Sequence, residues 1–192
     1  MTISQYEKRK EGSIYHYLSK YKHVPIWVLI NYLNLGELRN LLKKTVKSLQ
    51  NDISKDFCDF ISQNIEGKIA VFPPETLNSF LVNINEIRNI CAHNNRIIDY
   101  KCHQKVKYWE ILHDKYQIIE DNRNSVYSVF VSLQCFISNT EYAVLHNSIR
   151  KRINILSNQL KSISVNKILS KLGFPEDWHI KEKKFKHKDN YN

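Results

Sequence analysis

Apolar residues recur at intervals of three and four positions along most of this chain, which is the spacing of one buried helix face. The pattern is rarely interrupted, because only four glycines and four prolines occur in 192 residues. So few breaks favour long helices joined by few tight turns. Hydrophobic residues make up 42% of the chain, which is enough for a sizeable core. The sequence therefore predicts an all-α fold.

Three segments differ in character. Residues 1–24 are polar and tyrosine-rich, with a short helix expected over SIYHYLSKY. Residues 25–178 carry the strong helical periodicity and are predicted to form the folded domain. Residues 179–192 are basic, and we expect a mobile tail there.

The first strong element begins at Pro25, which suits a first helical turn, and its buried stripe is predicted to include Trp27. Residues 124–160 form the longest periodic segment. Its β-branched stretch VYSVFVS resembles a strand, but the length of the segment favours a helix. A last helix is predicted to stop at Gly173 and Pro175.

The chain is strongly basic, with a formal net charge of +10 and a pI of about 9.4. This balance favours a polyanionic partner such as RNA, DNA or an anionic membrane surface, although it also serves general solubility. The four cysteines are scattered, and the first residues do not resemble a signal peptide. The longest apolar run, PIWVLI, is too short to cross a bilayer. We expect a cytoplasmic protein with reduced thiols and no membrane partner.

One stretch, EIRNICAHNNRIIDY at residues 86–100, gathers polar side chains at the end of a predicted helix. We expect that helix over residues 75–96, with an apolar face running from Leu77 to Cys91. At about 100° per residue, Asn89, His93 and Arg96 share a neighbouring flank. Arg88 lies at the edge of the apolar face, roughly 140° from His93.

An arginine at the rim of an apolar face has two readings. Burying its charge is costly unless the side chain is paired or faces an interface. This reading indicates a dimer interface with the polar cluster at its edge. Alternatively, its stem packs while its charged head reaches water. Helix geometry alone does not separate these interpretations.

The six residues RNICAH, from Arg88 to His93, resemble the signature of HEPN domains, a class of helical nucleotide-binding domains. The longer run EIRNICAHNNRI is similar to Abi-like abortive-infection proteins of the AbiD/AbiF group. Two flanking segments, VPIWVLINYLNLGEL and KLGFPEDW, resemble that family as well. The resemblance covers about residues 14–180 and implies a HEPN-like helical bundle.

Many HEPN proteins are metal-independent endoribonucleases that work as dimers, with two motif helices forming one composite site. The resemblance thus implies phage defence by RNA cleavage through attack of the ribose 2′-hydroxyl, with no metal and no cofactor. His93 would be the general base or acid, and Arg88 would hold the scissile phosphate. Asn89 would orient His93 or the phosphate. Expected partners are RNA, a second copy of the chain, and an RNA or protein antitoxin.

Further RNA contacts are expected beside the motif and in the basic clusters. The predicted RNA-binding residues are Asn95, Arg96, Arg150, Lys151 and Arg152. Each basic cluster could equally be a solvated face. A second function class is a non-catalytic HEPN module that binds RNA or a partner, and a third is a helical DNA-binding protein.

Two other chemistries can be written from the same region. Cys91, His93, Cys102 and His103 could form a zinc set, but their spacing fits no established pattern. A cysteine nucleophile paired with histidine is the other, although nothing nearby in the sequence activates Cys91 or Cys102. The sequence also lacks GxxxxGK[ST] and GxGxxG loops, so it gives no support for nucleotide-driven chemistry.

Overall fold

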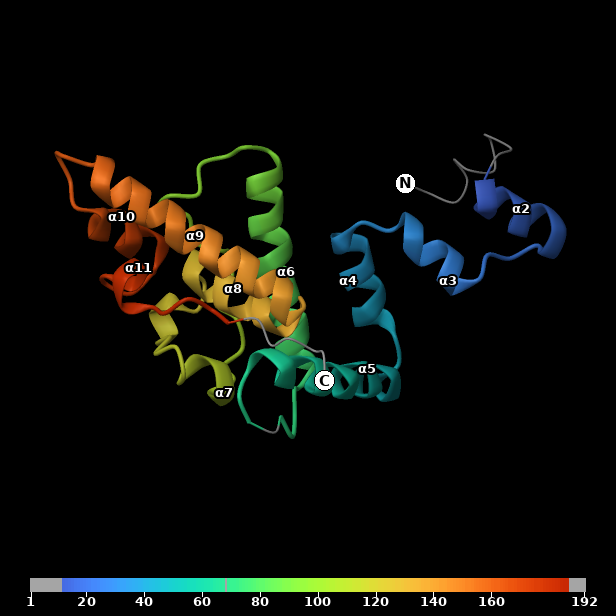
Figure 1. Cartoon of the computed structure of the whole chain (residues 1–192). Coiled ribbons are helices and arrows are strands. Elements are labelled where there is room, and N and C mark those ends of the chain that lie inside the picture. The colour runs from blue at the N-terminus through green and yellow to red at the C-terminus, as the bar shows by residue number, and fades with distance from the viewer. Residues whose placement is uncertain (1–11, 68, 187–192) are drawn as a thin grey trace. The chain divides into compact units, whose positions relative to one another are not determined.

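The computed structural model describes residues 12–67 and 69–186, and these residues are helical without any strand (Figure 1). The only extended pairing in this part of the chain is an isolated antiparallel bridge between Lys101 and Ser125. The prediction of an all-α fold is confirmed. None of the helices in the described ranges combines the length and apolar character that a bilayer crossing requires.

The chain divides into two compact units, residues 1–45 and 46–192. In the first unit the structure describes four short helices. They are α2 (Gly12–Tyr21), α3 (Ile26–Leu29), the 3₁₀ helix η1 (Ile30–Tyr32) and α4 (Leu35–Lys44). The helix expected over SIYHYLSKY is present as α2. Trp27 is 67% exposed, so its predicted place in a buried stripe is wrong.

The second unit contains the larger core. Its elements are α5 (Lys47–Asn64), α6 (Pro74–Ala92), α7 (Glu110–His113), η2 (Glu120–Asn122), α8 (Val126–Ser132), η3 (Leu133–Cys135), α9 (Asn139–Gln159), α10 (Val165–Leu172) and α11 (Trp178–Lys181). Pro74 occupies the first turn of α6, where the missing N–H is no loss because it would have no partner within the helix.

Helix α8 is the centre of this unit. Every residue from Tyr127 to Ser132 is buried, so the helix is enclosed on all sides. This explains how a β-branched stretch forms a helix, because packing around the whole circumference outweighs its intrinsic preference for strand. Figure 1 shows α8 between α6 and α9, and the ring of Phe130 lies 5.5 Å from that of Tyr142 on α9.

The long apolar segment predicted over residues 124–160 is helical, but it is two helices and not one. Helix α8 passes into η3, and α9 then begins at a capping box in which Ser138 and Glu141 bond each other's backbone N–H groups. The buried amide of Asn64 donates to the carbonyls of Gln134 and Ile137, at 2.7 and 2.8 Å. These bonds satisfy carbonyls that would otherwise be left unpaired where the helical segment ends before α9.

Aromatic side chains fasten the C-terminal elements to the core. The ring of Trp178 lies 5.0 Å from Phe174, 5.1 Å from His146 and 5.7 Å from Phe130. Helix α10 ends, as predicted, at Gly173, whose φ of 80° is the left-handed conformation that glycine adopts without strain. This part of the chain is therefore an integral layer of the second unit.

The basic segment expected as a tail after residue 178 begins with α11 and continues along α9. Asn147 exchanges two hydrogen bonds with the backbone of Phe185, at 2.9 and 3.0 Å. The Arg150 side chain donates to the carbonyl of Glu182 at 2.8 Å. Residues 182–185 are thus held against α9 by three hydrogen bonds, and the last six residues lie outside the described part.

Candidate functional site

The motif lies where α6 leaves the core. The buried residues of this helix, the last of which is Asn83, are all in its first half. Ile84 and Ile87 are half-buried, and Arg88, Asn89 and every residue from Cys91 to Arg96 are exposed. The predicted apolar face is therefore confirmed at its start, but Cys91 does not belong to the core. The polar cluster is presented to solvent at one end of the helix.

The helix ends at Ala92, four residues before the predicted end. His93 is its C-cap, and Asn94 follows with a φ of 52° in the left-handed region. The N–H of Asn94 bonds the carbonyl of Cys91 at 3.2 Å, and the N–H of Asn95 bonds that of Ile90 at 3.0 Å. This pair of bonds is the Schellman ending. Asn95 and Arg96 consequently lie in a loop and do not continue the helical flank.

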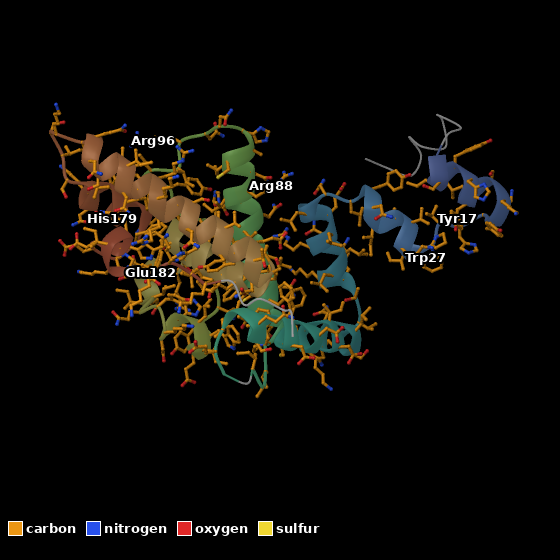
Figure 2. All side chains as sticks on the ribbon, viewed as in Figure 1. Tyr17, Trp27, Arg88, Arg96, His179 and Glu182 are labelled. Atoms are coloured by element: carbon orange, nitrogen blue, oxygen red, sulfur yellow. The ribbon has the colours of Figure 1, made fainter. Side chains whose placement is uncertain are left out.

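The three predicted catalytic residues occupy the last turn and the cap of α6. Arg88 donates to the side-chain oxygen of Asn89 at 3.1 Å. Within the described ranges the His93 ring has no hydrogen-bond or ion-pair partner, and it forms no bond with Arg88. Figure 2 shows Arg88 on α6 and Arg96 beyond the end of that helix. An exposed imidazole without a partner is accessible to a substrate.

Arg96 is held by an ion-pair cluster. It contacts Asp99 at 3.0 Å, and Lys171 of α10 contacts the same carboxylate at 2.6 and 2.8 Å. The hydrogen bond from Lys171 is the main reason that the pKa of Asp99 lies below its usual value, and Arg96 adds to this effect. The carboxylate thus pairs with two cations beside the motif and offsets one of their two charges.

A second network lies on α6 itself. The Glu86 carboxylate accepts hydrogen bonds from the Tyr100 hydroxyl, from the backbone N–H of His103 at 3.1 Å and from Nδ1 of His103 at 2.7 Å. The bond to Glu86 raises the pKa of Tyr100 to about 12. The His103 side chain is 87% exposed, whereas that of Glu86 is 17% exposed. An oriented imidazole therefore stands at the surface close to the motif helix.

Sequence reasoning did not identify Glu86, Asp99 or Lys171 as site residues, and it considered His103 only as a zinc ligand. Glu86 had a detectable signal, because it precedes His93 by seven residues and so shares its helix face. The contacts of Asp99 with Lys171 and of Glu86 with His103 join residues 72 and 17 positions apart. No local pattern predicts such pairs.

The loop after the motif is fixed to the core. The buried Asn83 amide donates to the carbonyl of Gln104 at 2.9 Å. Cys102 and Asn124 exchange two hydrogen bonds, at 2.8 and 3.1 Å. Cys102 is 2% exposed, and burial is the main cause that raises the pKa of its thiol to about 12. A thiol in that state is a poor nucleophile.

The basic cluster on α9 borders a groove of about 640 Å³. It is lined by Val144, Asn147, Ser148, Arg150, Lys151, Asn154, Ile155, Asn158 and Lys184. The described lining contains three cations, several amides and no carboxylate. Lys151 is exposed, whereas Arg150 is half-buried and donates to Glu182. Arg152, predicted together with them, is exposed but does not line the groove.

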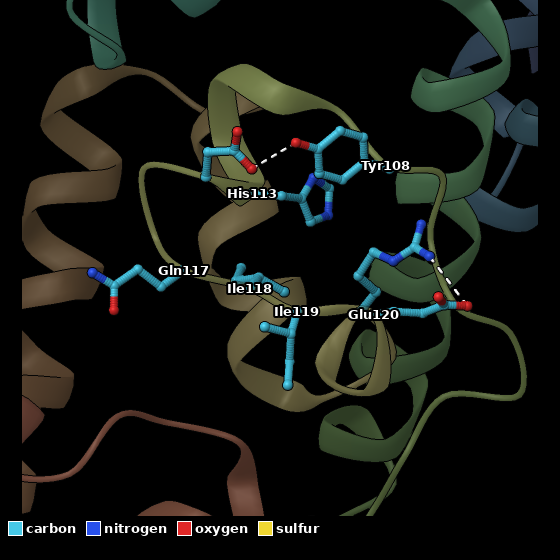
Figure 3. A pocket seen from close by; sticks show the side chains of 8 residues that line it. Tyr108, His113, Gln117, Ile118, Ile119 and Glu120 are labelled. Carbon is cyan, nitrogen blue, oxygen red and sulfur yellow. Dashed lines mark hydrogen bonds and ion pairs between the residues drawn. The ribbon is translucent and has the colours of Figure 1, made fainter.

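A further pocket of about 530 Å³ lies around α7 and contains no predicted site residue (Figure 3). Its charged residues are paired with other groups of the lining. The Tyr108 hydroxyl donates to Asp114 at 2.6 Å, and Arg123 pairs with Glu120 at 3.5 Å. Burial lowers the pKa of His113, whose ring faces Tyr108. This pocket therefore offers less free positive charge than the groove on α9.

Metal-ligating residues do not gather around the motif. In residues 12–67 and 69–186, no three histidine, cysteine, aspartate or glutamate side chains are grouped so that they could hold a metal ion. Cys91 is exposed, Cys102 is buried, and His103 is bonded to Glu86. The alternative zinc set is therefore not assembled in the described structure.

A comparison with protein families gives one match. The family model described as Abi-like protein matches residues 2–99, about half of the 192 residues. The matched region includes the motif from Arg88 to Arg96 and ends before the Gly-Phe-Pro segment at residues 173–175. No curated protein and no solved structure gave a significant match.

Proposed function

The chain belongs to the family of Abi-like proteins, and from this premise we propose that it acts in abortive infection as an endoribonuclease of the HEPN type. It would belong to the AbiD/AbiF group and limit phage growth by cleaving RNA. The observation that carries the proposal is the exposed end of α6, where Arg88, Asn89 and an unpartnered His93 face solvent among the described residues.

The proposed reaction uses the nucleophile that RNA itself carries. His93 removes the proton from the ribose 2′-hydroxyl, whose oxygen then attacks the adjacent phosphorus. Arg88 donates hydrogen bonds to the phosphate and stabilises the negative charge that develops on it. Asn89, already bonded to Arg88, orients the guanidinium. The products are a 2′,3′-cyclic phosphate and a 5′-hydroxyl end.

We propose that the working site forms between two copies of the chain. Arg88 and His93 do not contact each other within one chain, but two α6 helices that meet at this end bring two copies of each together. Half-buried Ile84 and Ile87 continue the apolar face of α6 toward the motif and provide a contact surface for the second copy.

The groove on α9 suits the backbone of a single RNA strand. Its cations attract phosphates, and Ser148 and Asn158 offer additional hydrogen-bond donors. Val144 and Ile155, which are 56% and 40% exposed, provide apolar surface for ribose or base faces. We assign Lys151 and Arg150 to this path, and Asn95 and Arg96 to the phosphates nearest the motif.

Lys151→Glu is expected to weaken RNA binding more than Arg152→Glu does. The two changes alter net charge equally and lie side by side on α9, but only Lys151 lines the groove. The measurement is the salt dependence of binding to a single-stranded RNA, whose slope should fall by about 0.7 for each lost phosphate contact. Equal losses for both variants would contradict the groove and favour an unspecific charge effect.

Asp99→Asn is expected to strengthen RNA binding by about twofold to fivefold, the scale of one exposed ion pair. Its lowered pKa keeps the native carboxylate ionised at neutral pH, and the pairing is lost only when the pH falls through that lowered value. Asparagine keeps the shape and tolerates the φ of 67° at this position while releasing Arg96 and Lys171.

The matched control for Asp99→Asn is Asp121→Asn. It also removes one exposed carboxylate that is paired with a lysine, in this case Lys105 at 3.0 Å, and it changes net charge by the same amount. Binding titrations of the two variants separate a local effect from a general one. A gain of equal size in both would overturn the assignment of Arg96 to RNA.

The experiment that tests the function is incubation of the protein with total RNA and with tRNA in EDTA. The proposal predicts cleavage in the chelator and fragments that end in 2′,3′-cyclic phosphate. Tight RNA binding without cleavage would instead favour the second candidate, a non-catalytic HEPN module under the control of an antitoxin RNA or protein. Light scattering at the same concentration measures whether the chain is a dimer.

A further inference from the structure

The bonds of Glu86 determine which nitrogen of His103 is free. An ionised carboxylate only accepts hydrogen bonds, so Nδ1 of His103, 2.7 Å from the Glu86 oxygen, carries a proton. The backbone N–H of the same residue binds the same carboxylate, which fixes the ring from two points. The other nitrogen, Nε2, has no role in this pairing, and the side chain that carries it is 87% exposed.

A carboxylate on Nδ1 of an exposed imidazole is an arrangement suited to proton transfer. It orients the ring, selects the tautomer and stabilises the imidazolium when Nε2 is also protonated. Tyr100 donates to the same Glu86 carboxylate, so the orienting group is itself held in place. The pairing leaves Nε2–H available to donate a proton to a bound molecule.

The position of this pair relates it to His93. Glu86 and His93 are seven residues apart, which places them within about 20° on one face of α6 and roughly 10 Å apart along its axis. His103 is attached to that face through Glu86. Two hydrogen bonds of about 2.8 Å with a phosphate between them span most of this distance. An RNA strand on this face could contact both histidines.

Cleavage by the 2′-hydroxyl needs two proton transfers, one to a base and one from an acid, and His93 is assigned the first of them. We propose that His103 is the general acid of the reaction, with Glu86 as its positioning residue; this inference rests on the proposed ribonuclease function. His93 takes the proton of the 2′-hydroxyl as the new O2′–P bond forms. The P–O5′ bond breaks, its electron pair stays on O5′, and that oxygen receives the proton from Nε2 of His103.

A substrate with an altered leaving group tests this assignment directly. The RNA is an oligonucleotide that contains a cleavage site mapped with the wild-type protein, and its counterpart carries sulfur in place of the 5′ bridging oxygen at that site. A thiolate leaves without being protonated, so it needs no general acid. His103→Ala should slow cleavage of the normal RNA by about 10²- to 10⁴-fold but leave cleavage of the sulfur substrate near the wild-type rate.

Three variants separate catalysis from structure. His93→Ala should slow both substrates, because the attacking hydroxyl still needs a base. His103→Asn keeps a donor for Glu86 but has no group that can act as an acid, so it should behave like His103→Ala. Glu86→Gln should lower kcat more than it raises KM. His23→Ala, an exposed histidine in the first unit, should leave both substrates unaffected.

Each outcome decides between stated alternatives. Wild-type rates for His103→Ala on normal RNA, or an equal loss on both substrates, would overturn the role of His103 and leave the ribonuclease function standing. Full activity in His103→Asn would mean that the residue only supports the loop. Failure of the wild-type protein to cut either RNA would overturn the proposed function itself.

Discussion

His93→Ala is expected to reduce the rate of RNA cleavage by about 10²- to 10⁴-fold, the usual contribution of a general acid or base. Arg88→Ala is expected to cost about 10²- to 10³-fold, because it removes a donor to the charged transition state. Both side chains are exposed, and the His93 ring has no partner in the described ranges, so the fold should keep its stability. Rates are measured on RNA in EDTA, with survival of cells that express each variant as a second readout.

RNA binding distinguishes this result from simple loss of the protein. His93→Ala should bind single-stranded RNA as the wild type does, since the residue acts on a proton and not on the backbone charge. Arg152→Ala, an exposed arginine outside the groove on α9, serves as the control for Arg88→Ala. If His93→Ala still cut RNA at the wild-type rate, the assignment of the motif as the active site would be wrong.

Gly173→Ala is expected to destabilise the second unit by about 2–5 kcal/mol and to lower its melting temperature by something on the order of 10 °C. Two effects add. Gly173 has a φ of 80°, and a Cβ there would lie 2.4 Å from the Cβ of Ser125 and 2.6 Å from its Oγ. Ser125 is the N-cap of α8 and accepts the N–H of Ser128, so relief of the clash would disturb the central helix.

Gly67→Ala is the matched control for this substitution. Gly67 also has a positive φ, 109°, but none of the described residues has an atom within 4 Å of the Cβ position. It should therefore cost only the backbone conformation, about 1–3 kcal/mol. Thermal unfolding followed by circular dichroism measures both variants. Equal melting temperatures would show that the contact with Ser125 yields without cost.

The sequence predicted the fold class and several helix ends because these depend on local chemistry. Pro74 and Gly173 act through their own backbone geometry, so their effects are visible without a structure. The Ser138–Glu141 capping box was equally local. It would have divided the long segment correctly if the S-x-x-E pattern had been given more weight than the continuous periodicity.

Other features depended on neighbours that no pattern reveals. Helical periodicity shows which residues share one face of a helix. It does not show how much of that face a neighbouring helix covers. For this reason Trp27 and Cys91 were expected to be buried and are exposed. The end of α6 was misplaced because Asn94 takes the left-handed conformation, which asparagine adopts only in some contexts.

The candidate site shows the same division. RNICAH is contiguous, so the sequence alone predicted that Arg88, Asn89 and His93 form one site. The groups that surround them come from elsewhere, with Lys171 on α10 and His103 beyond the loop. The sequence predicted Arg150 as an RNA-binding residue, but it did not reveal the hydrogen bond that its side chain donates to the carbonyl of Glu182.

The burial of α8 also shows that the region matched by the family model cannot be an independent folding unit. The match ends at residue 99, whereas the helix that fills the centre of the second unit begins at Val126. Phe80, fully buried on α6, lies beside His113, which is also outside the matched region. A fragment that ended at residue 99, where the match ends, would therefore lack the core helix that its own buried residues pack against. Substitutions in the second half must therefore preserve the packing that buries Phe80 and the other core residues of the first half.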